Sequence, residues 1–177
     1  MGIYKNIAGE NERIIAAGSY VNQRGARVEL GDAVAVACQG TRSYSPDQTR
    51  QLFQEQAAGT GARRETAFEV TGETSTGAGQ RLVLGEGAAG VAILNFASAR
   101  NPGGGYLGGA RAQEEDLCRS SALYTTLLEA RDYYEAHRAD RDTRYSHRVI
   151  FSPGVPVYRD GKPTGELPGR LLRSGQR

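Results

Sequence analysis

Two adjacent glutamates, Glu114 and Glu115, follow a run of three glycines in the stretch NPGGGYLGGARAQEEDL, residues 101–117. The glycines, residues 103–105, have no side chains, so a ligand can approach their backbone closely and their N–H groups can form an anion-binding nest. The helix expected after this loop adds unpaired N–H groups and the positive end of its dipole. We therefore interpret the stretch as a diphosphate site, with an ordinary tight turn as the alternative.

The two glutamates are expected to have different roles. Successive helical side chains diverge by about 100°, so Glu114 and Glu115 cannot both point at one atom of a ligand. Acidic residues are common in a first helical turn simply because they complement the dipole. Beside a bound ribose, however, a carboxyl group could act as a general acid on a glycosidic bond.

The spacing of the glycines also matches the dinucleotide-binding fingerprint. Gly103, Gly105 and Gly108 satisfy G-x-G-x-x-G literally. The loop from Ala97 to Pro102 is too long for the tight turn of that motif, and the expected acidic position about twenty residues on falls at Glu129, inside a predicted helix. A nicotinamide or flavin cofactor is therefore disfavoured.

The surrounding elements predict an α/β domain. An apolar run without alternation, GVAILNFA at residues 90–97, indicates a strand buried on both faces directly before the glycine loop. Helices alternate with apolar strands through most of the chain, so we expect a three-layer α/β/α architecture. Helices are predicted at residues 10–18, 46–56 and 114–138, strands at 32–40, 65–75 and within 147–160, and a loop with a helical segment at 76–90.

Composition narrows the class further. The net charge of +2 over 177 residues gives no argument for a nucleic-acid partner. No apolar run is long enough to cross a bilayer, and no secretion signal is visible, so a cytoplasmic location is expected. Cys38 and Cys118 stand far apart, which argues against a disulfide framework or a zinc site. His137 and His147 also lack metal-ligand spacing and are expected at the surface.

The sequence around the glycine loop resembles a known family. The segment LNFASARNPGGGYLGGARAQEE, residues 94–115, is similar to the signature of bacterial-type poly(ADP-ribose) glycohydrolases, which have a macrodomain fold: three glycines, six to eight residues, then Gln-Glu-Glu. The flanking stretches DLCRSSALYTTL and FSPGVPVYRD also resemble the family, with weaker similarity in QGTRSY and TGETS. The likeness covers residues 1–165, and residues 166–177 are expected to be a polar tail.

The resemblance implies a fold, a reaction and a set of site residues. The fold would be a macrodomain-like mixed sheet, and the reaction would be cleavage of the ribose–ribose O-glycosidic bond of poly(ADP-ribose) with release of ADP-ribose. No metal or organic cofactor is implied; the partners would be the polymer and ADP-ribosylated proteins, and a monomer is expected. The implied roles are general acid/base for Glu115, ribose hydroxyl binding for Glu114, ribose orientation for Ser98 or Asn101, diphosphate binding for Gly103, Gly104 and Gly105, and substrate binding for Gln113.

The sequence departs from the family in one respect. Family members normally carry further strands and a second glycine-containing phosphate loop, and neither has a counterpart after Arg159. The domain is therefore expected to be shortened at its C-terminal end. A non-catalytic ADP-ribose-binding macrodomain is the alternative function, although simple binding does not need two glutamates after the loop.

Overall fold

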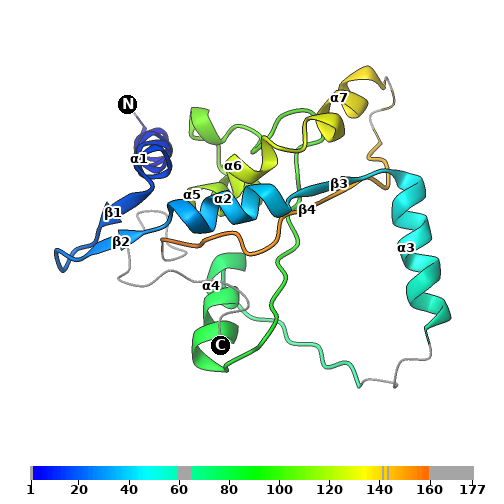
Figure 1. Cartoon of the computed structure of the whole chain (residues 1–177), viewed down its shortest axis with the longest axis horizontal. Helices are drawn as coiled ribbons and strands as arrows, with labels where there is room; N and C mark the ends of the chain where they lie inside the picture. Colours follow the sequence, from blue (N-terminus) through cyan, green and yellow to red (C-terminus); the bar gives the residue numbers. More distant parts are fainter. Residues whose placement is uncertain (1, 60–64, 141, 143, 160–177) are drawn as a thin grey trace.

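A computed structural model of the chain describes residues 2–59, 65–140, 142 and 144–159. Helices dominate the described part, and the strands form short antiparallel pairs (Figure 1). The elements, in chain order, are α1 (Ile3–Ala17), β1 (Ser19–Val21), β2 (Arg27–Glu29), α2 (Gly31–Gly40), β3 (Arg42–Tyr44), α3 (Pro46–Ala58), α4 (Ser75–Gln80), the π-helical turn η1 (Arg81–Gly85), the 3-10 turn η2 (Tyr106–Gly108), α5 (Gln113–Ser120), α6 (Leu123–Leu127), α7 (Arg131–Ala139) and β4 (Val149–Phe151).

The strands form two small sheets. Strand β1 pairs antiparallel with β2, and β3 pairs antiparallel with β4, which lies more than a hundred residues further along the chain. The chain is thus a mixed α/β protein, as predicted. Within the described residues the strands are confined to these two pairs and one isolated bridge between Ser121 and Val157.

Two predicted helices, α1 and α3, are present in the structure, and each has one end at the predicted residue. Helix α1 ends at Gly18, the predicted stop, which adopts the left-handed conformation with φ of 64°. The helix begins at Ile3, earlier than the predicted residue 10. Helix α3 begins with a capping box, in which Ser45 and Gln48 exchange side-chain-to-backbone hydrogen bonds, and has Pro46 in its first turn. None of the described side chains of α3 is buried, and the helix lies apart from the other elements (Figure 1).

Residues 32–40 form helix α2, so the predicted strand is wrong. Ala33, Val34 and Ala37 are buried, and this spacing of one and four residues is that of one helix face. The run alternates alanine with valine, and alanine has the highest helix propensity of any residue. Packing against α6 and α1 therefore determines the structure of this segment.

The predicted single helix over residues 114–138 is also wrong, because the chain breaks into α5, α6 and α7. The first break is at Ser121, whose φ of −148° and ψ of 176° are those of extended backbone. Ser121 forms a β-bridge with Val157, and the neighbouring Ala122 N–H donates to the Pro156 carbonyl at 3.0 Å. This pairing confirms the extended piece predicted near the end of the 147–160 stretch, as β4 confirms its beginning.

Neither predicted strand at 65–75 or 90–97 has strand partners in the described part of the chain. Residues 65–72 are coil, and 75–80 belong to α4. In residues 91–97 the exposure of side chains alternates in part: Leu94 and Phe96 are 74% and 71% exposed, Ile93 is 39% exposed, and Val91, Asn95 and Ala97 are partly buried. The segment therefore resembles a strand of which one face is partly covered.

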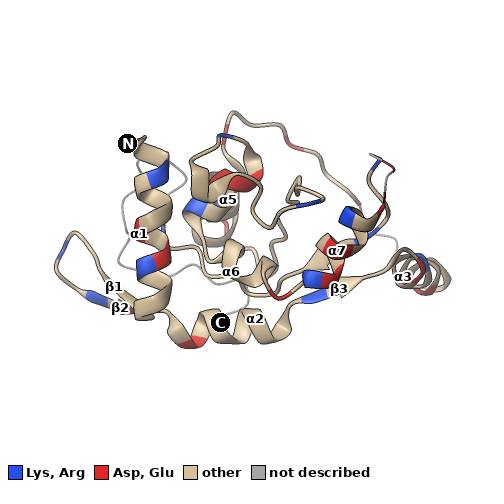
Figure 2. Ribbon diagram, turned by 90° about the horizontal axis from the view of Figure 1, so that it is seen from above, with Lys and Arg blue, Asp and Glu red and all other residues tan. Residues whose placement is uncertain are grey.

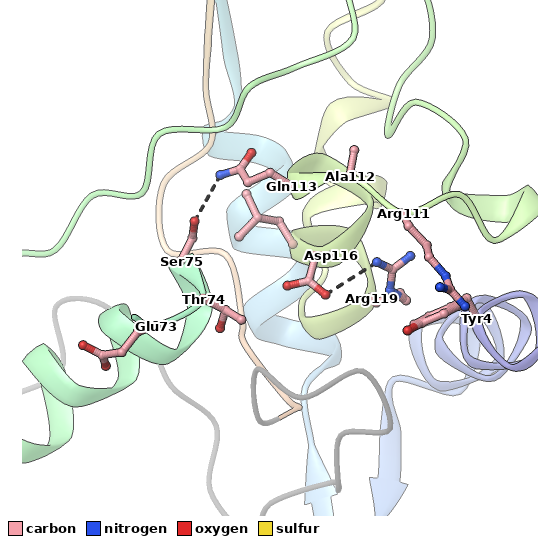
Figure 3. A pocket seen from close by; sticks show the side chains of 10 residues that line it. Tyr4, Glu73, Thr74, Ser75, Arg111, Ala112, Gln113, Asp116 and Arg119 are labelled. Carbon is pink, nitrogen blue, oxygen red and sulfur yellow. Dashed lines mark hydrogen bonds and ion pairs between the residues drawn. The ribbon is translucent and has the colours of Figure 1, made fainter. Parts of the chain in front are cut away.

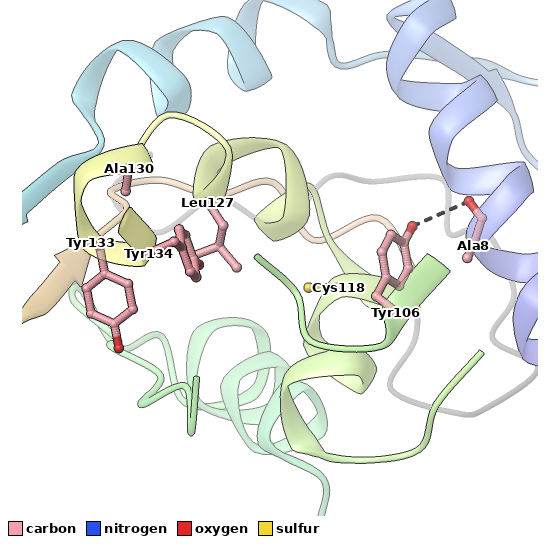
Figure 4. Packing of buried hydrophobic residues seen from close by; sticks show 7 residues of the cluster. All are labelled: Ala8, Tyr106, Cys118, Leu127, Ala130, Tyr133 and Tyr134. Carbon is pink, nitrogen blue, oxygen red and sulfur yellow. Dashed lines mark hydrogen bonds between the residues drawn. The ribbon is translucent and has the colours of Figure 1, made fainter. Parts of the chain in front are cut away.

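A tyrosine-rich cluster forms the part of the core nearest the glycine loop. Tyr106, which directly follows the three glycines, is 1% exposed and packs beside the buried Cys118 (Figure 4). The other members of this cluster are Ala8, Leu127, Ala130, Tyr133 and Tyr134. His137, predicted at the surface, is instead buried next to it, with ring nitrogens 2.8 Å from the Tyr133 carbonyl and from the Ser146 hydroxyl.

A buried polar network fixes the C-terminal end of α5. The Asn11 side chain, completely buried, donates to the Arg119 carbonyl at 2.6 Å. Its oxygen accepts from Arg159 Nε at 2.7 Å, and Arg159 also pairs with Glu10 at 2.7 Å. Helix α1 thereby holds both α5 and the last described residue of the chain.

We expect Asn11→Ala to lower the free energy of unfolding by about 2–4 kcal/mol, because the buried Arg119 carbonyl loses its donor and the buried Arg159 guanidinium loses one of its acceptors. Urea denaturation measures this loss. Asn6→Ala in the same helix is the matched control, since Asn6 is exposed, and should change stability little. Equal effects of the two substitutions would contradict the role of the network.

Candidate active site

The three-glycine loop has a backbone that only glycine tolerates. Gly103 and Gly104 have φ of 65° and 56°, in the left-handed region. A Cβ on Gly103 would lie 2.8 Å from the Tyr124 ring, and one on Gly105 would lie 2.7 Å from the Ala110 Cβ. The loop therefore packs closely on the core. Its three glycines have no side chains that would cover their own backbone.

Glu115 is held directly by this loop. The Gly105 N–H donates to Glu115 Oε1 at 2.8 Å, and the residue is 6% exposed. Its second oxygen, Oε2, is buried and has no hydrogen-bond partner among the described residues. The backbone of the loop thus positions one oxygen of this buried carboxyl group, and the other makes no hydrogen bond to the described residues.

Glu114 points to the segment before the loop. Its Oε1 accepts from Asn95 Nδ2 at 3.2 Å, and its Oε2 accepts from the Ser98 N–H at 2.8 Å. Burial raises the pKa of Glu114 above its usual range; the hydrogen bonds from Ser98 and Asn95 oppose this rise, and the nearby charge of Glu115 adds to it. The two glutamates therefore have different environments, as the helical geometry predicted.

Ser98 and Asn101 shape the turn that leads into the glycines. The Ser98 hydroxyl accepts from the backbone N–H groups of Arg100 and Asn101, at 3.3 and 3.2 Å. The Asn101 carbonyl accepts from the Gly104 N–H at 3.0 Å. The structure thus brings both residues to the glutamates and the loop; their contact with a ribose stays a prediction.

The Gln113 side chain points to residues 94–96 and to Ser75. Its Oε1 accepts from the Phe96 N–H at 2.9 Å, and its Nε2 donates to the Leu94 carbonyl at 2.7 Å. Nε2 also lies 3.3 Å from the Ser75 hydroxyl. The amide pairs with the backbone of residues 94–96 as a neighbouring strand would, and so connects this segment to α5. The structure therefore shows Gln113 as a positioning residue. Its contact with substrate stays a prediction.

Gln113→Ala should therefore loosen the segment that carries the partners of Glu114. We expect a loss of about 1–3 kcal/mol in stability, from the carbonyl and N–H left unpaired. Hydrogen exchange at the Phe96 amide should accelerate more than exchange at the Tyr106 amide, which bonds to Gly103. Unchanged exchange at Phe96 would show that the amide does not hold the segment.

Sequence reasoning missed Asn95 and Tyr106. Asn95 is the one polar residue inside the apolar run 91–97, and that exception was a signal that its side chain has a specific partner. The Tyr106 hydroxyl lies 3.2 Å from Glu12 Oε1, so the loop is anchored to α1. Nothing in the local pattern around Tyr106 predicts that long-range contact.

A separate pocket of about 440 Å³, whose lining includes neither Glu114 nor Glu115, opens beside α5 (Figure 3). Its walls include Gln113 and Asp116 of α5 and Ser75 at the start of α4. The guanidinium carbons of Arg111 and Arg119 lie 4.5 and 4.7 Å from the centre of the Tyr4 ring. These cation–π contacts close one side of the pocket.

Charges are otherwise dispersed over the described surface. Lysine and arginine residues alternate with acidic residues along α1 and α7, and acidic residues gather at the start of α5 (Figure 2). Among the described residues, no three histidine, cysteine, aspartate or glutamate side chains come together as metal ligands. None of the described helices has the length and apolar character needed to span a membrane.

Fold and site together define an α/β protein in which a pair of buried glutamates is set against a loop of three consecutive glycines. Comparison with known proteins identifies the family. Residues 8–160 match the sequence model described as "Microbial-type PARG, catalytic domain". The chain therefore belongs to the family of microbial-type poly(ADP-ribose) glycohydrolase (PARG) catalytic domains, and the resemblance seen in the sequence is confirmed.

Solved structures agree with this assignment. Poly(ADP-ribose) glycohydrolase from Thermomonospora curvata is 42% identical, with a TM-score of 0.85 over 96% of this chain and 61% of that one. Its complex with the inhibitor ADP-HPD gives 42%, 0.83, 96% and 59% in the same order. The Deinococcus radiodurans enzyme in complex with ADP-ribose is 40% identical, with a TM-score of 0.68 over 79% of this chain and 54% of that one.

This chain thus spans roughly three-fifths of the length of the Thermomonospora structures that it matches. No curated protein matches the chain. The predicted polar tail, residues 166–177, lies outside the described residues.

Proposed function

We propose that this protein hydrolyses the ribose–ribose O-glycosidic bonds of poly(ADP-ribose) and releases ADP-ribose. The observation that carries the proposal is the Glu115 carboxyl group, bonded through one oxygen to the Gly105 N–H while its buried second oxygen has no partner among the described residues. The related Thermomonospora and Deinococcus proteins are poly(ADP-ribose) glycohydrolases, with ADP-HPD and ADP-ribose bound respectively. Their site is the natural model for this one.

In this mechanism the glycine loop binds the diphosphate and so places the neighbouring ribose at α5. Backbone N–H groups and the positive end of the helix favour the negative charge of the diphosphate. Glu115 then donates its proton from Oε2 to the departing ribose oxygen. The resulting carboxylate accepts a proton from the attacking water, which completes the hydrolysis and restores the acid.

Glu114 orients the ribose in the same mechanism. Its oxygens accept hydrogen bonds from the Asn95 side chain and the Ser98 N–H, and the Gly103 backbone also interacts with the carboxyl group. A carboxylate oxygen has two acceptor positions, so both oxygens can also accept from ribose hydroxyls. Glu114 thereby links substrate position to the conformation of residues 95–98.

Incubation of the chain with automodified poly(ADP-ribosyl)ated protein tests the proposal. Chromatographic detection of free ADP-ribose supports the hydrolase. Retention of the polymer without release supports the alternative, a non-catalytic ADP-ribose-binding macrodomain. A protein that neither retains polymer nor binds ADP-ribose in calorimetry would contradict both functions.

A further inference from the structure

The pocket beside α5 contains two arginines that lie against one aromatic ring. The guanidinium carbons of Arg111 and Arg119 are 4.5 and 4.7 Å from the centre of the Tyr4 ring, and all three residues line the pocket (Figure 3). The face of an aromatic ring attracts a cation, so Tyr4 restricts where the two guanidinium groups can lie. Two positive charges are thereby held close together at one wall of the pocket.

Arg119 is a buried cation whose charge is weakly compensated. The residue is 5% exposed, and its Nη1 donates to the Ala110 carbonyl at 2.7 Å. Its Nη2 lies 3.5 Å from Asp116 Oδ1, which is a long distance for an ion pair. Its Nε is buried and has no hydrogen-bond partner among the described residues. A buried guanidinium in this condition favours a further negative charge nearby.

Arg111 presents its guanidinium group to the pocket. The residue is exposed, and within the described part of the chain the group contacts the Tyr4 ring and makes neither a hydrogen bond nor an ion pair. A guanidinium group is planar and can bind a phosphate through two parallel hydrogen bonds. Because Tyr4 holds this group in place, less conformational entropy is lost when it binds a ligand.

The charges that line the pocket are not balanced. Glu73 pairs with Arg81 at 2.9 Å, so its charge is compensated by a residue that does not line the pocket. Asp116 is the partner of Arg119. Arg111 therefore remains as a positive charge that no carboxylate among the described residues compensates, and an anionic ligand suits the pocket.

The size of the pocket indicates what carries the anion. Its volume of about 440 Å³ lies within the range of small-molecule sites, roughly 300–1,000 Å³, and exceeds what a phosphate ion alone fills. Gln113 and Ser75 add an amide and a hydroxyl group to the lining. We propose that the pocket is a second binding site, separate from the two glutamates, for an organic phosphate such as a nucleotide, and that Arg111 binds the phosphate group.

Two sources supply this chemistry. The first is a free nucleotide. The second is the diphosphate of a poly(ADP-ribose) unit other than the one cleaved, and this source rests on the proposed function. Either one brings phosphate oxygens to Arg111. Gln113 lines the pocket and directly precedes Glu114 in α5, so the pocket and the two glutamates share one helix.

Titration of the isotope-labelled chain with AMP, followed by NMR, tests the site. We expect saturable shifts at the backbone amides of Ser75, Arg111 and Gln113. Adenosine, which lacks the phosphate, should cause no comparable shifts. Shifts confined to the amides of Gly104 and Gly105 would place AMP at the glycine loop and overturn the proposal, as would the absence of any saturable shift.

Variants with opposite expected effects test the role of charge. Arg111→Gln should weaken AMP binding about tenfold or more, since it removes a charge-assisted contact. Asp116→Asn should strengthen binding about twofold or more, because it removes a negative charge that repels the phosphate. Arg24→Gln is the matched control: Arg24 is an exposed arginine between β1 and β2, outside the pocket, and AMP affinity should not change. Equal losses in Arg111→Gln and Arg24→Gln would show that only net charge matters and would overturn the proposal.

The release assay distinguishes the two sources. If the pocket binds a further unit of the polymer, Arg111→Gln should raise KM for poly(ADP-ribose) and leave kcat near the parental value. An unchanged KM, together with weakened AMP binding, assigns the pocket to a free nucleotide. A chain that binds AMP through Arg111 but releases no ADP-ribose would count against the hydrolase and leave the second site intact.

Discussion

Glu115→Gln is expected to lower the rate of ADP-ribose release by about 10²- to 10⁴-fold, the usual contribution of a general acid. Glutamine has nearly the same shape as glutamate, and its amide oxygen can still accept from the Gly105 N–H, as Glu115 Oε1 does at 2.8 Å. The substitution removes the proton that Oε2 would donate. Binding of ADP-ribose should therefore persist, and the measurement is release from automodified protein beside calorimetry with ADP-ribose.

Glu114→Gln provides the contrast for this prediction. The Glu114 oxygens accept from Asn95 and from the Ser98 N–H, so an amide NH₂ in place of one oxygen meets a donor. We expect weaker ADP-ribose binding together with slower release, a different pattern from that of Glu115→Gln. Release at the parental rate by the Glu115→Gln protein would show that Glu115 is not the acid.

The sequence predicted those elements whose signals are local. Gly18, the predicted stop, ends α1 because glycine adopts the left-handed conformation readily, and α3 begins at the predicted residue 46, where the structure adds a capping box formed by Ser45 and Gln48. The close contact between the glycine loop and the glutamates was predictable for the same reason. Loop and helix are adjacent in the chain, and their geometry is set within a few residues.

Elements decided by distant contacts were not predictable in this way. The break at Ser121 depends on its bridge to Val157, which lies far along the chain. The run of alanine and valine in α2 predicts a strand, because these residues fit both a strand and a helix. Only packing in the folded protein distinguishes the two structures. The partners of Glu114 and Gln113 lie in residues 94–98, some twenty positions upstream, and no spacing rule connects them.

The apolar run at 90–97 illustrates the limit of composition as a guide. Its residues suit a strand covered on both faces, whereas in the described structure Asn95 is only partly buried and Leu94 and Phe96 are more than two-thirds exposed. The composition thus indicates a segment suited to burial on both faces. Within the described residues, only part of that burial is present.

Gly104→Ala is expected to reduce ADP-ribose release by about 10²-fold, because a small displacement of a catalytic group has effects of this size. A Cβ at this position would lie 2.5 Å from Glu115 Oε1 and 3.2 Å from Glu114 Oε2. Both atoms end flexible side chains, so the fold survives while the two carboxyl groups move. The φ of 56° adds a stability cost of about 1–2 kcal/mol.

The matched control for Gly104→Ala is Gly108→Ala, in the same loop region. Gly108 has no positive φ, and a Cβ there would meet nothing within 4 Å. It should therefore keep both ADP-ribose release and the melting temperature near those of the parent protein. Gly104→Ala should lower release far more than its modest loss of stability explains. Melting curves and release assays on the same variants therefore distinguish a displacement of the glutamates from a weakened fold. Equal release by the two alanine variants would mean that the glutamates are not held against the loop during turnover.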